Sequence, residues 1–110
     1  MKNEMEPIVV TTTSDDRKQL MNLAHKSVEK NIAACAQIGA SPVTSVYRWE
    51  GKVETAEEFV LTIKTSKHHF PAVEETICEH HNYEVPQIVA VPMSSVGVKY
   101  QKWLDEQLNG

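Results

Sequence analysis

The sequence has little glycine, little cysteine and no long apolar run, and each shortage narrows the possible functions. Its 110 residues include 4 glycines, and no glycine-rich phosphate-binding loop is present. The 2 cysteines, Cys35 and Cys78, form no CxxC pair, so we expect reduced thiols. No segment approaches the roughly 20 apolar residues that span a bilayer, and the charged N-terminus lacks the apolar run of a signal peptide. A cytoplasmic protein without a membrane partner is therefore expected.

The sequence also has fewer basic than acidic residues, 11 against 15. The net charge is -4 and the sequence pI is about 5.7, so no positive field is available to hold a nucleic-acid backbone. The HExxH and GxSxG signatures of common hydrolases are missing as well, and we expect no enzyme. With 41% hydrophobic and 24% charged residues, the chain fits a single soluble domain over residues 1–110, with residues 1–6 as a flexible tail.

Hydrophobic periodicity predicts the secondary structure. The β-branched run IVVTTT favours a strand, and the polar residues after it favour a helix start. Alternation predicts two long middle strands around a turn at Glu50 and Gly51, whereas helical spacing marks the segments before His81 and at the C-terminus. The predicted strands are 8–13, 32–38, 43–49, 59–64 and 87–91, and the predicted helices are 14–31, 66–81 and 100–108. This order predicts an α+β fold, a ferredoxin-like βαββαβ sandwich with a long central hairpin and an extra C-terminal helix.

The hairpin from Val43 to Thr65 takes a large share of a small chain. Typical strands have roughly 5 to 6 residues, so we expect its far end to project beyond the sheet with Tyr47 and Trp49 on an open edge. An edge of this kind is normally covered by another element. In a closed ring each hairpin can pair with the next subunit, and the sequence therefore predicts a cyclic homo-oligomer.

Five motifs along the chain resemble those of one protein family. They are AACAQI, SVYRWEGKVE, FVLTIKT, HNYEVPQIVAVP and YQKWLDEQL, and they cover nearly the whole sequence. In order and spacing they look like the signatures of the CutA divalent-cation tolerance proteins. The resemblance implies a ferredoxin-like subunit in a homotrimer, similar in architecture to the PII signalling proteins. It also implies a bacterial cytoplasmic location and an association with tolerance of copper and other divalent ions.

His80 and His81 are the candidate metal ligands. Imidazole suits Cu(II), Ni(II) and Zn(II), and the resemblance places this pair at positions that bind copper together with a first-strand cysteine. Here Thr12 occupies the matching first-strand position, which argues against a Cu(I) site. Neighbours on a helix also point about 100° apart, so a regular helix would separate the two rings. The alternative is a solvated helix end, where imidazole is favoured by the negative carbonyl pole.

A second candidate site is a ligand cleft between subunits. Its expected residues come from strands and from the YEVP step, and they are Cys35, Tyr47, Trp49, Lys64, Tyr83 and Glu84. Lys64 lies on the face opposite Leu61, so it needs either a carboxylate or an anionic ligand. Two interpretations without a ligand also remain open for this set of residues. They are a structural ion pair between Lys64 and Glu84, and an oligomer interface lined by the aromatic residues.

Three hypotheses about function follow from these patterns. The first is a non-enzymatic homotrimer that binds a divalent metal ion, with copper as the candidate, and that serves cation tolerance. The second is a PII-like signalling module that binds a small anion between subunits and reports it to an unidentified protein. The third is an enzyme whose site forms at the subunit interface.

Overall fold

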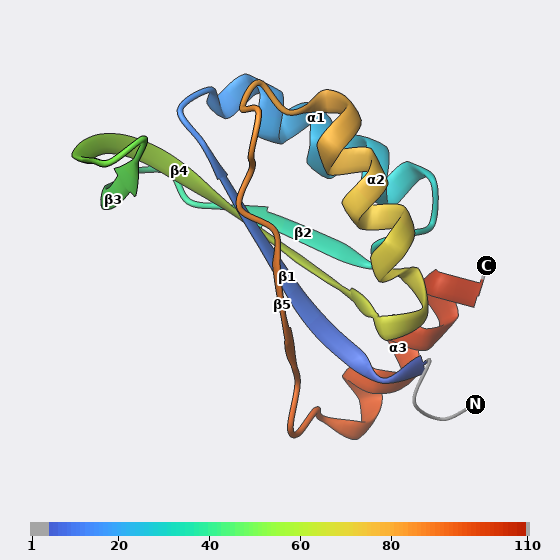
Figure 1. The fold of residues 1–110 in the computed structure, drawn as a ribbon. Helices are drawn as coiled ribbons and strands as arrows, with labels where there is room; N and C mark the ends of the chain where they lie inside the picture. The colour runs from blue at the N-terminus through green and yellow to red at the C-terminus, as the bar shows by residue number, and fades with distance from the viewer. Residues whose placement is uncertain (1–4, 110) are drawn as a thin grey trace.

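A computed structural model describes residues 5–109, so residues 1–4 of the predicted tail lie outside the described range. Helices α1 and α2 lie side by side over one face of a twisted sheet, while α3 lies at one end (Figure 1). Glu6, at the end of the predicted tail, accepts a bond from the Lys67 amide at 2.8 Å. The elements in chain order are β1 (Pro7–Ser14), α1 (Arg17–Glu29), β2 (Cys35–Ile38), β3 (Val43–Trp49), β4 (Lys52–Ser66), η2 (Lys67–His69), α2 (Phe70–His80), β5 (Val89–Pro92) and α3 (Val98–Asn109).

The sheet is antiparallel throughout, with the order β2-β4-β1-β5. Strand β4 is long enough to pair twice along its length. Its second half pairs with β1 and β2, and its first half pairs with β3 to form the hairpin. The split βαβ order read from the sequence is therefore confirmed, and the ferredoxin-like α+β class with it.

The core lies between the sheet and helices α1 and α2. On β1, the alternate residues Ile8 and Val10 point toward the helices and are buried, as are Leu61 and Ile63 on β4. Helix residues close the layer from the other side. The fully buried ones are Leu20 and Leu23 of α1 and Val73 and Ile77 of α2. The period-two and helical patterns of the sequence thus identify both halves of the core.

Local signals fix the ends of the first helix and the hairpin. Asp16 is the N-cap of α1, where its carboxylate accepts from the Gln19 amide at 3.2 Å. Glu50 and Gly51 form the predicted turn with φ of 50° and 81°, which is the left-handed pair that a two-residue hairpin requires. The hairpin projects away from the helices (Figure 1), and its Val46 and Val53 are 67% and 64% exposed.

Several details differ from the sequence prediction. The last strand is Val89–Pro92 and lies exposed at the sheet edge, so the prediction of a core strand over residues 87–91 was wrong. On α3 the buried positions are Leu104 and Leu108, whereas Tyr100 is exposed. Ser66 does not cap α2, because a 3-10 turn intervenes and the Ser66 hydroxyl bonds to the ring of His69. The errors at β5 and α3 concern packing between distant segments, which local periodicity does not encode, whereas the error at Ser66 is local.

Candidate functional site

The segment after α2 is held against the end of β1 by a set of side-chain hydrogen bonds. Asn82 makes three of them. Its Oδ1 accepts from the Ser14 hydroxyl at 3.0 Å, its Nδ2 donates to Asp15 at 2.9 Å, and its backbone amide donates to Gln19 at 2.8 Å. These bonds join residues more than 60 positions apart in the chain. They fix the path of residues 83–87 and so place this segment opposite the hairpin.

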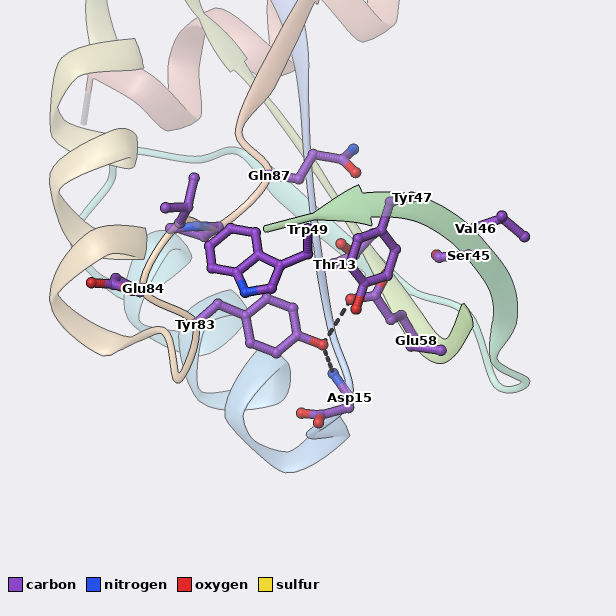
Figure 2. Close-up of a pocket in the computed structure, with 13 residues that line it drawn as sticks. Thr13, Asp15, Ser45, Val46, Tyr47, Trp49, Glu58, Tyr83, Glu84 and Gln87 are labelled. Atoms are coloured by element: carbon purple, nitrogen blue, oxygen red, sulfur yellow. Dashed lines mark hydrogen bonds between the residues drawn. The ribbon is translucent and has the colours of Figure 1, made fainter. Parts of the chain in front are cut away.

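A pocket of about 700 Å³ lies between that segment and the hairpin. Trp49 and Tyr47 contribute from β3, Glu58 contributes from β4, and Tyr83 and Glu84 contribute from the segment after α2 (Figure 2). The volume is within the range of small-molecule sites, which is roughly 300–1,000 Å³. The walls combine aromatic rings with carboxylates, and no lysine or arginine among residues 5–109 lines the pocket.

Glu58 is the most deeply buried carboxylate in this pocket. Its residue is 6% exposed, and Oε2 accepts from the Tyr83 hydroxyl at 2.7 Å. The same hydroxyl accepts from the Asp15 backbone amide at 3.1 Å, so Tyr83 links β4 to the residue that follows β1 (Figure 2). Within residues 5–109, no ion pair compensates the Glu58 charge. A buried carboxylate therefore faces the pocket with a single hydrogen bond from a neutral donor.

The environment of Tyr83 keeps its hydroxyl protonated. Burial raises the pKa of Tyr83 well above its usual value of 10.0, and the hydrogen bond and the charge of Glu58 raise it further. The Asp15 amide acts in the opposite direction, because it stabilises the phenolate. Tyr83 is thus a hydrogen-bond donor to Glu58 and cannot serve as a phenolate ligand near neutral pH.

His81 has both ring nitrogens engaged by the backbone. Its Nε2 contacts the Thr13 carbonyl at 2.7 Å, and the Tyr83 amide donates to Nδ1 at 3.0 Å. These partners assign the proton to Nε2 and the lone pair to Nδ1. As folded, His81 holds the segment after α2 in place and has no lone pair available for a metal ion.

His80 points back along its own helix and leaves one nitrogen available. Its Nδ1 donates to the Thr76 carbonyl at 3.0 Å, so the lone pair lies on Nε2. This is the arrangement of many metal-bound histidines, whose second nitrogen is held by a carbonyl or carboxylate. The two neighbouring histidines therefore differ, and only His80 has the tautomer of a ligand.

Thr12, at the first-strand position where the resemblance implies a cysteine ligand, does not complete a metal site within one chain. Thr12 is fully buried on the helix-covered face of β1, and its hydroxyl has no hydrogen-bond partner among the described residues. A threonine hydroxyl is a poor substitute for a soft thiolate. In residues 5–109, no group of three or more His, Cys, Asp or Glu side chains is arranged to hold an ion. One chain therefore supplies a single suitable donor, His80, and does not fit a complete copper site by itself.

The six residues of the expected ligand cleft separate into two groups. Tyr47, Trp49, Tyr83 and Glu84 line this pocket within one chain. Cys35 and Lys64 do not.

Cys35 and Lys64 are paired across β2 and β4, in the half of the sheet near α3. The Lys64 Nζ lies 5.7 Å from the centre of the Tyr100 ring, a cation–π distance. Burial raises the pKa of Tyr100, and the adjacent Cys35 adds to the rise. Lys64 therefore has an aromatic partner within its own chain and does not contribute positive charge to the pocket.

The sequence prediction missed Glu58 and Asp15 as pocket residues. Glu58 lies on the strand face opposite Phe59 and Leu61, where alternation predicts a solvent-exposed side chain. One signal of its burial was available in the sequence. Glu58 lies two residues before Val60, so the two side chains share a strand face, and an apolar residue on that face indicates that the face can be covered. Burial by Tyr83, which is 25 residues further along the chain, could not be predicted from that signal.

None of the helices within residues 5–109 is both long enough and apolar enough to cross a membrane.

Comparisons with known proteins agree over nearly the whole chain. Residues 8–107 match the family described as CutA1 divalent ion tolerance protein. The divalent-cation tolerance protein CutA of Thermus thermophilus is 37% identical over 102 residues, which are 93% of this chain and 97% of that protein. The chloroplastic protein CutA of Arabidopsis thaliana is 37% identical over 88% of this chain, which spans 53% of the plant protein. The structure of the periplasmic divalent cation tolerance protein CutA from Archaeoglobus fulgidus superposes with a TM-score of 0.88 at 30% identity, covering 93% of this chain and 98% of that one.

Proposed function

Because the chain belongs to the CutA1 divalent ion tolerance family, we propose that it acts in the tolerance of divalent cations by binding such ions, with copper as the first candidate. The observation that supports direct binding is the tautomer of His80, whose Nε2 lone pair is free while Nδ1 is held by Thr76. A histidine oriented in this way is a suitable ligand for Cu(II) and Zn(II). The other ligands of such an ion are water or donors from a second subunit, since residues 5–109 of one chain hold no group of three or more suitable side chains.

The proposed role is that of a binding protein. The names of the family and of the relatives describe tolerance proteins and name no reaction. A location in the cytoplasm is part of the proposal, although the plant relative is named as chloroplastic and the Archaeoglobus protein as periplasmic.

A homotrimer is proposed as the working form. The projecting hairpin and the exposed edge strand β5 support it, since both present unpaired backbone groups that a neighbouring subunit can bond. An arginine at Val60 or at Trp49 should weaken assembly and stability together. Subunit mass measured by light scattering, beside thermal unfolding, tests this prediction. A variant that keeps the wild-type mass and melting temperature would place the interface elsewhere.

Titration calorimetry of Cu(II) and of Zn(II) into chelator-treated protein tests the metal site. We expect saturable binding by the wild type, and at least tenfold weaker binding by His80→Ala. The matched variant is His81→Ala, which should retain the ion affinity but unfold more easily, since its ring bonds Thr13 and Tyr83. Equal affinities for wild type and His80→Ala would exclude His80 as a ligand. Loss of affinity in His81→Ala alone would show that the ion displaces the Tyr83 amide.

A second candidate function is a signalling module that binds a small ligand and reports it to another protein. The pocket of about 700 Å³ favours it, because the pocket collects four of the residues expected in a ligand cleft. Binding of a small molecule that survives His80→Ala would support this function over the first.

A further inference from the structure

The pocket between the hairpin and residues 83–87 contains a buried negative charge without a cation. Glu58 is 6% exposed, and its one hydrogen bond within the described residues comes from the neutral Tyr83 hydroxyl. Placing a carboxylate in a low-dielectric site is unfavourable unless a positive group and further hydrogen-bond donors compensate it. The second carboxylate oxygen of Glu58 can accept another hydrogen bond. The site therefore favours an occupant that is positively charged and that donates hydrogen bonds.

The aromatic walls favour the same kind of occupant. The rings of Trp49, Tyr47 and Tyr83 gather around the space in front of Glu58 (Figure 2). The faces of aromatic rings attract cations, most strongly those of tryptophan, and the attraction increases where water is excluded. Asp15 and Glu84 add negative charge at the rim. The aromatic rings and the carboxylates thus both favour a positively charged ligand.

Two other occupants fit less well. An anion would meet three carboxylates and, in the described part of the chain, no basic side chain, because Lys64 lies beside Tyr100 in another part of the sheet. A bare metal ion needs several ligands at short distances, and residues 5–109 offer no such group of side chains. A metal ion would also leave most of a pocket of about 700 Å³ unfilled.

We propose that this pocket binds a small organic cation, a primary ammonium or guanidinium compound, whose charged group pairs with Glu58 while its stem packs against Trp49 and Tyr47. This inference rests on the second proposed function and gives the chemical class of its ligand. It is independent of the proposed metal site at His80.

Three probes with the same four-carbon stem separate charge from shape. They are butylammonium, 1-butanol and butanoate, added to the full-length protein at neutral pH. Binding is followed by the indole N–H resonance of Trp49 in NMR spectra, and the resonance of Trp103 on α3 serves as an internal reference. We expect a saturable shift of the Trp49 signal with butylammonium, at least tenfold weaker binding of 1-butanol, and no binding of butanoate.

Matched variants test the role of the buried carboxylate. Glu58→Gln keeps the size of the side chain and an oxygen for Tyr83, but it removes the charge. It should weaken butylammonium binding at least tenfold. Glu57→Gln removes the same charge from the neighbouring exposed residue, on the other strand face, and should change the affinity less than twofold. Trp103→Phe should leave the affinity unchanged. Trp49→Leu, detected by calorimetry, should weaken butylammonium binding without altering Glu58.

The outcomes distinguish failure of this inference from failure of the pocket as a ligand site. Binding of butanoate at least as tight as that of butylammonium overturns the cation assignment but keeps a ligand-binding pocket. The absence of any Trp49 shift with all three probes overturns both. If Glu58→Gln also lowers the subunit mass, the charge is compensated by a second copy of the chain, and the inference is wrong. Equal butylammonium affinities for Glu58→Gln and Glu57→Gln refute the role of Glu58.

Discussion

Replacing Tyr83 by phenylalanine removes one hydroxyl and tests how far the buried charge of Glu58 depends on it. The hydroxyl donates to Glu58 at 2.7 Å and accepts from the Asp15 amide at 3.1 Å. Hydrogen bonds to charged groups contribute about 1.5–3 kcal/mol to stability. Asp15 is exposed, so water can replace its lost acceptor, whereas Glu58 is 6% exposed and has less access to water. We therefore expect Tyr83→Phe to lower the free energy of unfolding by about 2–3 kcal/mol, nearly all of it through Glu58.

Urea unfolding monitored by circular dichroism measures this loss, with protein concentration held constant because assembly also contributes to stability. Tyr47→Phe is the matched control, since Tyr47 lines the same pocket and its hydroxyl has no hydrogen bond within the described residues. Its unfolding free energy should lie within about 0.5 kcal/mol of the wild type. A double-mutant cycle with Glu58→Gln should show coupling, because the hydroxyl matters less when its partner is neutral.

A change below about 0.5 kcal/mol in Tyr83→Phe would refute the reasoning. It would mean that water solvates Glu58 in the folded protein and that the carboxylate is not isolated. Equal losses in Tyr83→Phe and Tyr47→Phe would refute it in another way, because the cost would then belong to the pocket and not to the hydrogen bond with Glu58. Additive losses in the cycle would show that Tyr83 acts through Asp15.

Three further predictions concern the core, the hairpin turn and the response to pH. Leu61→Ala should lower the free energy of unfolding by about 2–5 kcal/mol in urea titrations, since Leu61 is fully buried; a smaller loss would indicate a core that collapses around the cavity. Gly51→Ala should cost about 1 kcal/mol because φ is 81° there, whereas Gly97→Ala, with open space and no positive φ, should be nearly neutral; equal effects would contradict the strain. Burial, then the charge of His68, lower the pKa of His69 below 6.5, while the Leu108 carbonyl raises it. The unfolded chain therefore binds this proton more readily, so the stability from neutral His69 is present above about pH 6.5 and decreases as the pH falls through the folded pKa. His69→Asn should flatten that decrease in unfolding measurements at several pH values, and an unchanged slope would assign it to other groups.

Much of the pocket could be anticipated one strand at a time. Alternation along β3 placed Tyr47 and Trp49 on one face, and both line the pocket. Tyr83 and Glu84 of the YEVP step line the same pocket. Lys64 was grouped with them because it lies on the face of β4 opposite Leu61, which is correct, but a strand of 15 residues carries it far from the hairpin. Alternation gives the face of a residue and says little about which end of a long strand meets a given loop.

The different states of His80 and His81 show a similar limit. The two rings meet different partners, but not because of helical spacing, since α2 ends at His80 and His81 has an extended backbone. Which ring keeps a free lone pair depends on the acceptors that each ring meets. His80 meets a carbonyl of its own helix four residues back, a local contact, whereas His81 meets the carbonyl of Thr13, 68 residues away. Two adjacent histidines in a sequence therefore do not show which of them has a free lone pair for a metal ion and which has a structural role.

The sequence by itself determined the order of the elements, the core faces of β1, β4, α1 and α2, and the turn at Glu50 and Gly51. These features depend on interactions between near neighbours, such as alternation, helical spacing and backbone preference. Only the tertiary structure decided that Glu58 is buried, that His81 has no free nitrogen and that Lys64 is remote from the pocket. Burial and hydrogen bonding depend on partners brought together from distant parts of the chain. The charge that the pocket selects therefore appears only when β1, the hairpin and residues 81–87 meet.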